Sequence, residues 1–268
     1  MSASAAYALD LSVEHGRLVR HRVAFPWSLG RPYSDERWSE AIRIIPQVAG
    51  AGLLSGDHVR QRLRLGAHAR MRLESAGAMQ VLSGDRGVAR SDWQFEIGPH
   101  AMLVLESEPY ALMPTTRLDL RNVIALDPGA ILLAAELVCP AVPDKPGEWR
   151  SETVVHDLAG CPLLIDRQEM FAQTAARLAR LPDHMTAFGT IWIMAQTCSD
   201  IVADLPDVPA RVGVTALRAG AGFAIRLGAR DGGKLRAASR RLMDALEPRL
   251  VARQAAASRA EPAMVAQT

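Results

Sequence analysis

The side chains that most often bind metal ions are scattered along this 268-residue chain. Its histidines and cysteines have no His-x-His, His-x3-His or Cys-x2-Cys spacing, the patterns that bring several ligands to one metal ion. These residues are His15, His21, His58, His68, His100, His156, His184, Cys139, Cys161 and Cys198. We therefore expect no closed cage for a structural metal. The histidines are interpreted as surface or core residues, and the cysteines as small buried hydrophobic residues, with metal contact as the less favoured alternative.

Nucleophilic catalysis would need a serine with a histidine close enough to act as its base. Ser55 and Ser75 are the candidate nucleophiles, but the sequence lacks the Gly-x-Ser-x-Gly elbow of the best-known serine hydrolases. We keep a β-rich hydrolase, or a small-ligand-binding module, as the alternative to a non-catalytic scaffold that binds other proteins.

The chain from about residue 6 to 166 repeats a unit of strand, glycine corner and strand. In the first unit, apolar residues alternate with arginines over residues 59–65, which is the period-2 pattern of a half-buried strand. Corners follow at Gly66, Gly98 and Gly129, each with a second apolar stretch after it. We interpret each unit as a hairpin. Because a hairpin cannot bury its apolar face alone, three units predict stacked antiparallel sheets, as an elongated β-sandwich or helical sheet body.

The sequence changes character after this body. The first predicted element is a helix at about 167–179, capped by Asp166. A buried strand at 188–194 leads into a short helix that ends near Leu205, and strands 212–217 and 223–227 form a hairpin. A helix at 231–253 and a disordered tail at 254–268 complete the chain. Pro248 is expected to kink the last helix or end it early. The predicted fold is mainly β, with a few α-helices in the C-terminal third, in one domain over residues 1–268 whose helix and hairpin part is 167–253.

Composition narrows the classes of partner and the compartment. The formal net charge is +2 and aromatic residues make up 5% of the chain, which argues against a nucleic-acid partner. The N-terminus lacks a basic region before an apolar core, and no apolar run approaches the roughly 20 residues of a membrane helix. An odd number of cysteines without paired spacing suits a reducing compartment. We predict a cytoplasmic protein that does not enter a membrane.

The stretch Gly52-Leu53-Leu54-Ser55-Gly56-Asp57, followed by a strand and a Gly66-Ala67 corner, resembles the urease accessory protein UreD (UreH) family. Further landmarks occur in the family's order along nearly the whole chain. They are Arg31-Pro32-Tyr33, Ala135-Glu136, Gly147-Glu148, Cys161-Pro162-Leu163-Leu164-Ile165-Asp166 and Gly213-Val214-Thr215-Ala216-Leu217. Glu74-Ser75-Ala76 stands where the family has Thr-Thr-Gln. The family-motif residues Gly52, Ser55, Gly56, Gly66 and Gly147 are expected to have structural roles.

The resemblance implies a non-catalytic scaffold that binds apo-urease on one side and the accessory proteins UreF and UreG on the other, with a dimer within that complex as a further expectation. Because such a protein guides nickel to urease, the resemblance also implies that nickel(II) binds only transiently and that no cofactor is tightly bound. Asp57, Glu136 and Glu148 are the candidate nickel-path residues. For Asp57 the alternative is a turn residue that caps backbone amides, and for the two glutamates it is a place on the rim of a sheet.

The last predicted helix carries a row of arginines opposite its apolar stripe. The candidates for binding a partner are Arg236, Arg240, Arg241 and Arg249, with Arg253 one turn further. A basic helical face of this kind either is solvated or docks on another protein, and a scaffold role favours docking.

Overall fold

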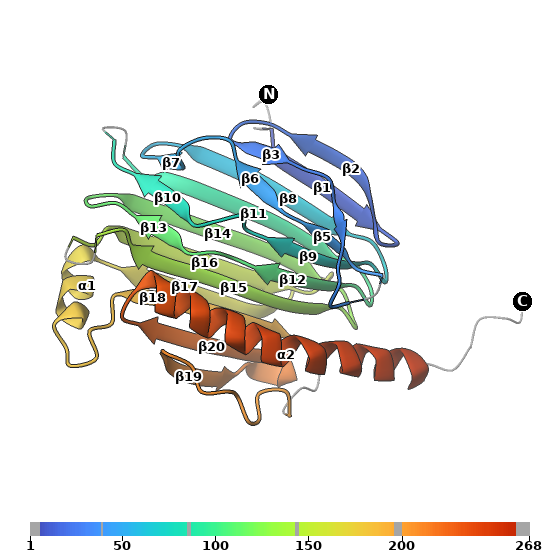
Figure 1. Ribbon diagram of the computed structural model, residues 1–268. Coiled ribbons are helices and arrows are strands. Elements are labelled where there is room, and N and C mark those ends of the chain that lie inside the picture. Colours follow the sequence, from blue (N-terminus) through green and yellow to red (C-terminus); the bar gives the residue numbers. More distant parts are fainter. Residues whose placement is uncertain (1–5, 39, 85–86, 143–144, 196–199, 261–268) are drawn as a thin grey trace, which may run out of the picture.

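Two β-sheets face each other, and one long helix lies against the outer side of the second sheet, as the computed structural model shows (Figure 1). The structure describes residues 6–38, 40–84, 87–142, 145–195 and 200–260, with the side chains of residues 257–260 left undescribed. No helix of the described residues is long and apolar enough to cross a membrane.

The first sheet has seven strands. In spatial order they are β17 (Pro162–Met170), β16 (Glu148–His156), β14 (Arg117–Leu126), β11 (Ala89–Ile97), β8 (His58–Leu65), β1 (Leu9–Glu14) and β2 (Arg17–Val23). Its outer face carries charged side chains at alternate positions, including the arginines of β8. Arg62 and Arg64 bind Asp10 of β1 at 2.7 and 3.1 Å, and the pKa of Asp10 is lowered chiefly by its hydrogen bond with Arg62.

The second sheet has eleven strands. Its main path is β19 (Arg211–Ala216), β20 (Gly222–Ala229), β18 (Ala187–Met194), β15 (Ile131–Pro140), β12 (Met102–Glu106), β9 (Arg70–Glu74), β5 (Ile42–Ile44) and β4 (Tyr33–Ser34), with β10 (Met79–Leu82), β13 (Tyr110–Leu112) and β7 (Leu53–Leu54) beside it. A separate pair consists of β3 (Trp27–Leu29) and β6 (Pro46–Val48). The helical elements are α1 (Ala172–Ala179), the short 3-10 turn η1 (Arg218–Gly220) and α2 (Gly232–Ala260).

The repeated units are coils of a solenoid, so the prediction of antiparallel hairpins within them is wrong. Each corner carries the chain from one sheet to the other, from β8 to β9, from β11 to β12 and from β14 to β15. Equivalent strands of successive units then pair in parallel, so that Leu63 lies beside Phe95 and Phe95 beside Ile124. Both arrangements give the same alternation along each strand, because the pattern reports which face is buried and not which strand lies alongside. The mainly β class with stacked sheets and a C-terminal helix is confirmed.

The stacking of coils explains the corner glycine at position 98. Gly98 donates its amide to the carbonyl of Leu65 in the preceding coil at 2.9 Å. A Cβ atom at this position would lie 2.8 Å from that same carbonyl oxygen, closer than real Cβ atoms approach. Glycine is required here because the backbone of one corner rests directly on the backbone of the next.

The core has one layer between the sheets and another beneath α2. Between the sheets, Leu63 and Phe95 of the first sheet pack with Met71 and Leu103 of the second. On the other side of the second sheet, a stripe of α2 is fully buried against β15, β18 and β20. This stripe consists of Leu235, Ala238, Leu242, Leu246 and Leu250. The second sheet is therefore covered on both faces, which is why β15 is apolar at almost every position.

The C-terminal predictions are right for the strands and partly wrong for the helices. Strand 188–194 and the hairpin of 212–217 and 223–227 are confirmed as β18, β19 and β20. The helix at 167–179 is wrong over its first part, because β17 continues to Met170 and only Ala172–Ala179 is helical. Asp166 lies inside β17 and caps no helix, since its carboxylate accepts hydrogen bonds from Trp192 and Arg226 of the second sheet.

The last helix is longer than the sequence suggests. It continues through Pro248 to Ala260, so the predictions of an early end and of a disordered tail from 254 are wrong for residues 254–260; residues 261–268 lie outside the described part of the chain. Tertiary contacts outweigh the local signals: Leu246 and Leu250 are fully buried on either side of the proline, and Gln254 donates to the carbonyl of His100 at 2.7 Å. A short helix was also predicted to end near Leu205. Its residues 196–199 lie outside the described part of the chain, and residues 200–204 form turns instead of a helix.

Candidate functional site

A cavity of about 400 Å³ lies between the two sheets. Aromatic rings from both sheets and from β3 form part of its wall, namely Trp27, Trp93, Phe95, Tyr110 and Trp192. Three carboxylates also line it: Glu74, Glu108 and Glu136. Glu74 ends β9, Glu108 follows β12 and Glu136 lies in the middle of β15, so the three come from successive coils of the solenoid. Two buried carboxylates and one half-buried carboxylate in a partly aromatic cavity make this the candidate functional site.

Glu136 and Asn122 are the polar interruptions in two apolar rows that face each other. Along β15, Leu132, Ala134 and Val138 join the clusters between the sheets, while the residues between them pack under α2. The period of two therefore points Glu136 into the interior. Asn122 holds the equivalent place on β14 and donates its amide to a Glu136 carboxylate oxygen at 3.0 Å.

Burial changes the acidity of Glu136. Glu136 is only 8% exposed to solvent. Loss of hydration raises the pKa of Glu136 to about 7, while hydrogen bonds from Ser151 and Asn122 and the charge of Arg226 act in the opposite direction. With a pKa of about 7, this carboxyl group exists in both protonation states near neutral pH.

A polar strip continues from Glu136 toward the outside of the molecule. The amide of Asn122 also donates to the hydroxyl of Thr153 at 3.0 Å. Beside it, Asp166 accepts the indole N–H of Trp192 at 2.9 Å and pairs with Arg226, whose guanidinium also donates to Thr190 at 2.6 Å. These residues join the two sheets through hydrogen bonds between groups that would otherwise be buried without partners.

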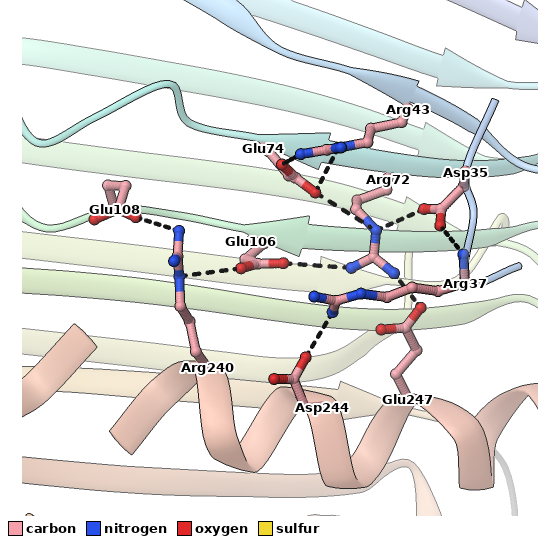
Figure 2. A network of polar contacts seen from close by, with 10 residues as sticks. All are labelled: Asp35, Arg37, Arg43, Arg72, Glu74, Glu106, Glu108, Arg240, Asp244 and Glu247. Atoms are coloured by element: carbon pink, nitrogen blue, oxygen red, sulfur yellow. Dashed lines mark hydrogen bonds and ion pairs between the residues drawn. The ribbon is translucent and has the colours of Figure 1, made fainter. Parts of the chain in front are cut away.

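The other two cavity carboxylates belong to a network of arginines and acidic residues between the second sheet and α2 (Figure 2). Its centre is Arg72, which is 2% exposed and binds Asp35 at 2.6 Å, Glu106 at 3.4 Å and also Glu247 of α2. Burial alone would lower the pKa of Arg72, but the hydrogen bond with Asp35 and the charge of Glu247 outweigh it and the pKa is raised. The network thus fastens α2 to the sheet with buried ion pairs.

Glu74 and Glu108 are each held by two arginines. Arg43 binds Glu74 through two hydrogen bonds of 2.9 and 2.6 Å, and Arg72 lies 3.7 Å from the same carboxylate. Arg236 and Arg240 of α2 both donate to one oxygen of Glu108 at 2.7 Å. By contrast, no arginine of the described residues lies within ion-pair distance of Glu136.

The three candidate nickel-path residues do not come together. Glu136 lines the cavity, whereas Asp57 and Glu148 do not. Asp57 accepts the backbone N–H of Leu54 at 2.8 Å, which is the turn-capping role considered as its alternative. Glu148 begins β16 and pairs with Arg117 at 3.2 Å on the side of the first sheet away from the cavity.

The family-motif residues have structural positions. Gly52 and Gly56 adopt positive φ, and Gly52 also lines the cavity. Ser55 is buried and donates its hydroxyl to the carbonyl of Leu82. A Cβ at Gly147 would lie 2.6 Å from the hydroxyl oxygen of Thr116, so a neighbour would have to shift, and a Cβ at Gly66 would make a tight contact of 3.1 Å with the side chain of Glu14.

Most of the α2 arginines that were candidates for binding a partner contact other residues of the same chain. Besides Arg236 and Arg240, Arg249 donates to the carbonyls of Ile201 and Ala203, and Arg253 pairs with Asp200 at 3.1 Å. Arg241 is exposed. Sequence reasoning missed that Arg236 and Arg240 have the buried Glu108 opposite them. It also missed Asn122, although an amide inside an apolar alternation was a visible signal.

The cysteines and histidines form no metal centre among the described residues, in which no group of three or more His, Cys, Asp or Glu side chains could hold an ion. Cys139 is buried, and burial raises the pKa of its thiol to about 11. The expectation that all cysteines are buried is wrong for Cys161, which is exposed in the turn before β17, and Cys198 lies outside the described residues.

Fold and site together define a class of protein: a two-sheet β-solenoid, braced by a C-terminal helix, with a carboxylate-lined interior. A sequence model of the UreD urease accessory protein family matches residues 3–262, and the chain belongs to this family. It is 26% identical over 229 residues to the urease accessory protein UreD of Mycolicibacterium smegmatis, covering 83% of this chain and 82% of the relative. It is also 26% identical over 233 residues to the urease accessory protein UreD 1 of Methylorubrum extorquens, covering 82% of this chain and 79% of the relative.

Proposed function

We propose that this chain is a non-catalytic scaffold in urease maturation, working in the cytoplasm. In this role it bridges apo-urease and the accessory proteins UreF and UreG and assists the insertion of nickel into the urease active site. Membership of the UreD family supports a role in urease maturation. The rigid two-sheet body, with charged side chains on the outer face of its first sheet, is suited to binding other proteins.

The observation that carries the nickel part of the proposal is the environment of Glu136. Nickel(II) accepts carboxylate and water oxygens as well as imidazole and thiolate. An ion in transit needs ligands that hold it weakly and exchange readily. Glu136 is a buried carboxyl group on a cavity wall, and its hydrogen-bond donors are the neutral amide of Asn122 and hydroxyl of Ser151. It has no arginine partner within ion-pair distance in the described part of the chain. It is therefore the one cavity carboxylate that is available to a passing cation, which then continues to urease.

The scaffold role is tested by purifying the untagged chain together with apo-urease, UreF and UreG, and then measuring urease activity after nickel is added. We expect one complex containing all four proteins, and activation that requires this chain. Failure to form the complex, or equal activation without the chain, would overturn the role.

A small-ligand-binding module remains the second candidate, because the cavity volume and its aromatic wall suit a small organic molecule. In that case Trp93→Ala would abolish function while Glu136→Gln would have little effect. A hydrolase is less well supported. Ser55 is bound to a backbone carbonyl, and no histidine is among the described residues that line the cavity beside Ser75.

A further inference from the structure

Most arginines on the outer face of the first sheet are neutralised within the sheet. Across β11, β14, β16 and β17, each arginine of this face has a carboxylate of a neighbouring strand within ion-pair distance. Three of these pairs join Arg117, Arg121 and Arg150 to Glu148, Glu152 and Glu169. Positive and negative side chains are therefore matched over this part of the face, which we call the balanced region.

Strand β2 forms one edge of the same sheet and has the opposite character (Figure 1). Its three arginines, Arg17, Arg20 and Arg22, are exposed, and the strand contains no acidic residue. Glu14 of β1 lies opposite Arg17 in the hairpin, but it forms no ion pair with it. In the described part of the chain, no carboxylate lies within ion-pair distance of any of the three arginines.

The other carboxylate of β1 is already occupied. Asp10 lies beside Arg22 in the sheet, so both side chains are on the outer face. Asp10 forms its ion pairs with Arg62 and Arg64 of β8, on its other side, at 2.7 and 3.1 Å. The pKa of Asp10 is lowered first by the hydrogen bond with Arg62, and the charge of Arg20 contributes less. Positive charge therefore predominates where β2, β1 and β8 meet.

The charge of this edge selects the kind of partner that it can bind. A second copy of the chain pairing through β2 would bring the same arginines together, and like charges on an edge strand oppose such pairing. An acidic protein surface would instead supply the carboxylates that the chain itself does not provide. Exposed guanidinium groups are well suited to this contact, because they bind carboxylates through two parallel hydrogen bonds.

We propose that Arg17, Arg20 and Arg22 form a docking edge for an acidic surface of a partner protein. This inference rests on the proposed scaffold role, and it adds which end of the first sheet meets a partner and with what charge. The balanced region of the same face has no comparable preference, because its arginines already have carboxylate partners.

The docking edge is tested by the association kinetics of the untagged full-length chain with apo-urease, UreF and UreG, each immobilised separately for biolayer interferometry. At about 50 mM salt, where surface charges are weakly screened, R17Q/R20Q/R22Q should associate with one of the three proteins about tenfold more slowly than the wild type. At about 0.5 M salt the two association rates should converge. Charges at the rim of an interface act mainly on the rate of association, which makes this rate the appropriate measurement.

Two further variants serve as controls. R117Q/R121Q/R150Q removes the same number of arginines from the balanced region, and it should associate with that protein at close to the wild-type rate. R17K/R20K/R22K keeps the three positive charges and should retain most of the wild-type rate.

The outcomes separate the docking edge from the scaffold role on which it rests. If the wild type binds none of the three proteins, the scaffold role is wrong and the docking edge is wrong with it. If the wild type binds, but R17Q/R20Q/R22Q associates no more slowly than R117Q/R121Q/R150Q, only the docking edge is wrong. If R17Q/R20Q/R22Q instead loses binding to double-stranded DNA, or self-association in sedimentation, with all three proteins bound as before, the edge has another occupant and the proposal is overturned.

Discussion

Glu136 of β15 and Asn122 of β14 meet between the two sheets, where the amide of Asn122 donates to the carboxyl group of Glu136 at 3.0 Å. Each is the polar member of an otherwise apolar interior row. The pair therefore marks the point where the hydrophobic layer between the sheets is broken, and it lies on the wall of the cavity.

The raised pKa of Glu136 makes stability depend on pH. Because burial favours the protonated form in the folded state, the stabilising contribution is fully present below the ordinary carboxyl pKa of 4.5 and is lost as pH rises through about 7. Relative to Glu136→Gln, the wild type should lose about 3 kcal/mol of unfolding free energy between about pH 4 and pH 9. Guanidinium denaturation of both proteins at the two pH values measures this. Parallel pH profiles would show that Glu136 titrates like an exposed group.

Arg72 is the residue of the network on which the attachment of α2 most depends. Arg72→Met leaves Asp35 and Glu247 buried without their cation, and should lower the free energy of unfolding by about 3–5 kcal/mol. Arg37→Met is the matched control, because the pair of Arg37 with Asp244 is 56% and 55% exposed and should contribute less than about 1 kcal/mol. Denaturant unfolding of the two variants gives both values. Equal losses of unfolding free energy in Arg72→Met and Arg37→Met would mean that the buried ion pairs of Arg72 stabilise the protein no more than the exposed pair of Arg37.

Gly52 is predicted to tolerate no side chain. Its φ is +136°, and a Cβ atom would lie 2.2 Å from the carbonyl oxygen of Gln80. Gly52→Ala should cost about 2 kcal/mol or more, seen as a lower melting temperature. Gly77→Ala in the neighbouring loop, where a Cβ would meet nothing within 4 Å, should leave the melting temperature nearly unchanged. A melting temperature for Gly52→Ala equal to that of Gly77→Ala would contradict the assigned backbone conformation.

Asp57 should prove to be a turn residue. Its carboxylate accepts the backbone N–H of Leu54 and does not line the cavity. Asp57→Asn keeps an acceptor at this place and should retain nickel-dependent urease activation, while Asp57→Ala should lower stability by about 1 kcal/mol. The activation assay with Asp57→Asn decides the matter: loss of activation with the complex intact would place Asp57 on a metal route after all.

The sequence was sufficient for the class of fold and not for its topology. Alternation over residues 59–65 and the corners at Gly66, Gly98 and Gly129 correctly located strands and turns. The same residues could not reveal that a corner leads to the opposite sheet, because alternation is a property of one strand and pairing is a property of two. The end of the last helix was mispredicted for a related reason. Pro248 is a local helix-breaking signal, but the burial of Leu246 and Leu250 on either side of it outweighs that signal.

The candidate site was predicted in part. Glu136 could be singled out because it ends an apolar run, and it does line the cavity. Arg236 and Arg240 were visible as a basic row on a helix. Their partner Glu108 was not, because it lies more than a hundred residues earlier and only the packing of α2 on the second sheet brings them together.

The central claim is that a cation reaches urease past Glu136, and the most direct test is nickel-dependent activation of urease in the assembled complex. Glu136→Gln keeps the size and the hydrogen-bonding capacity of the side chain but removes its charge, so we predict normal assembly with a clear loss of nickel incorporated into urease. Glu148→Gln, which changes an ion-paired glutamate away from the cavity, should incorporate nickel like the wild type. Full nickel incorporation with Glu136→Gln would contradict the account.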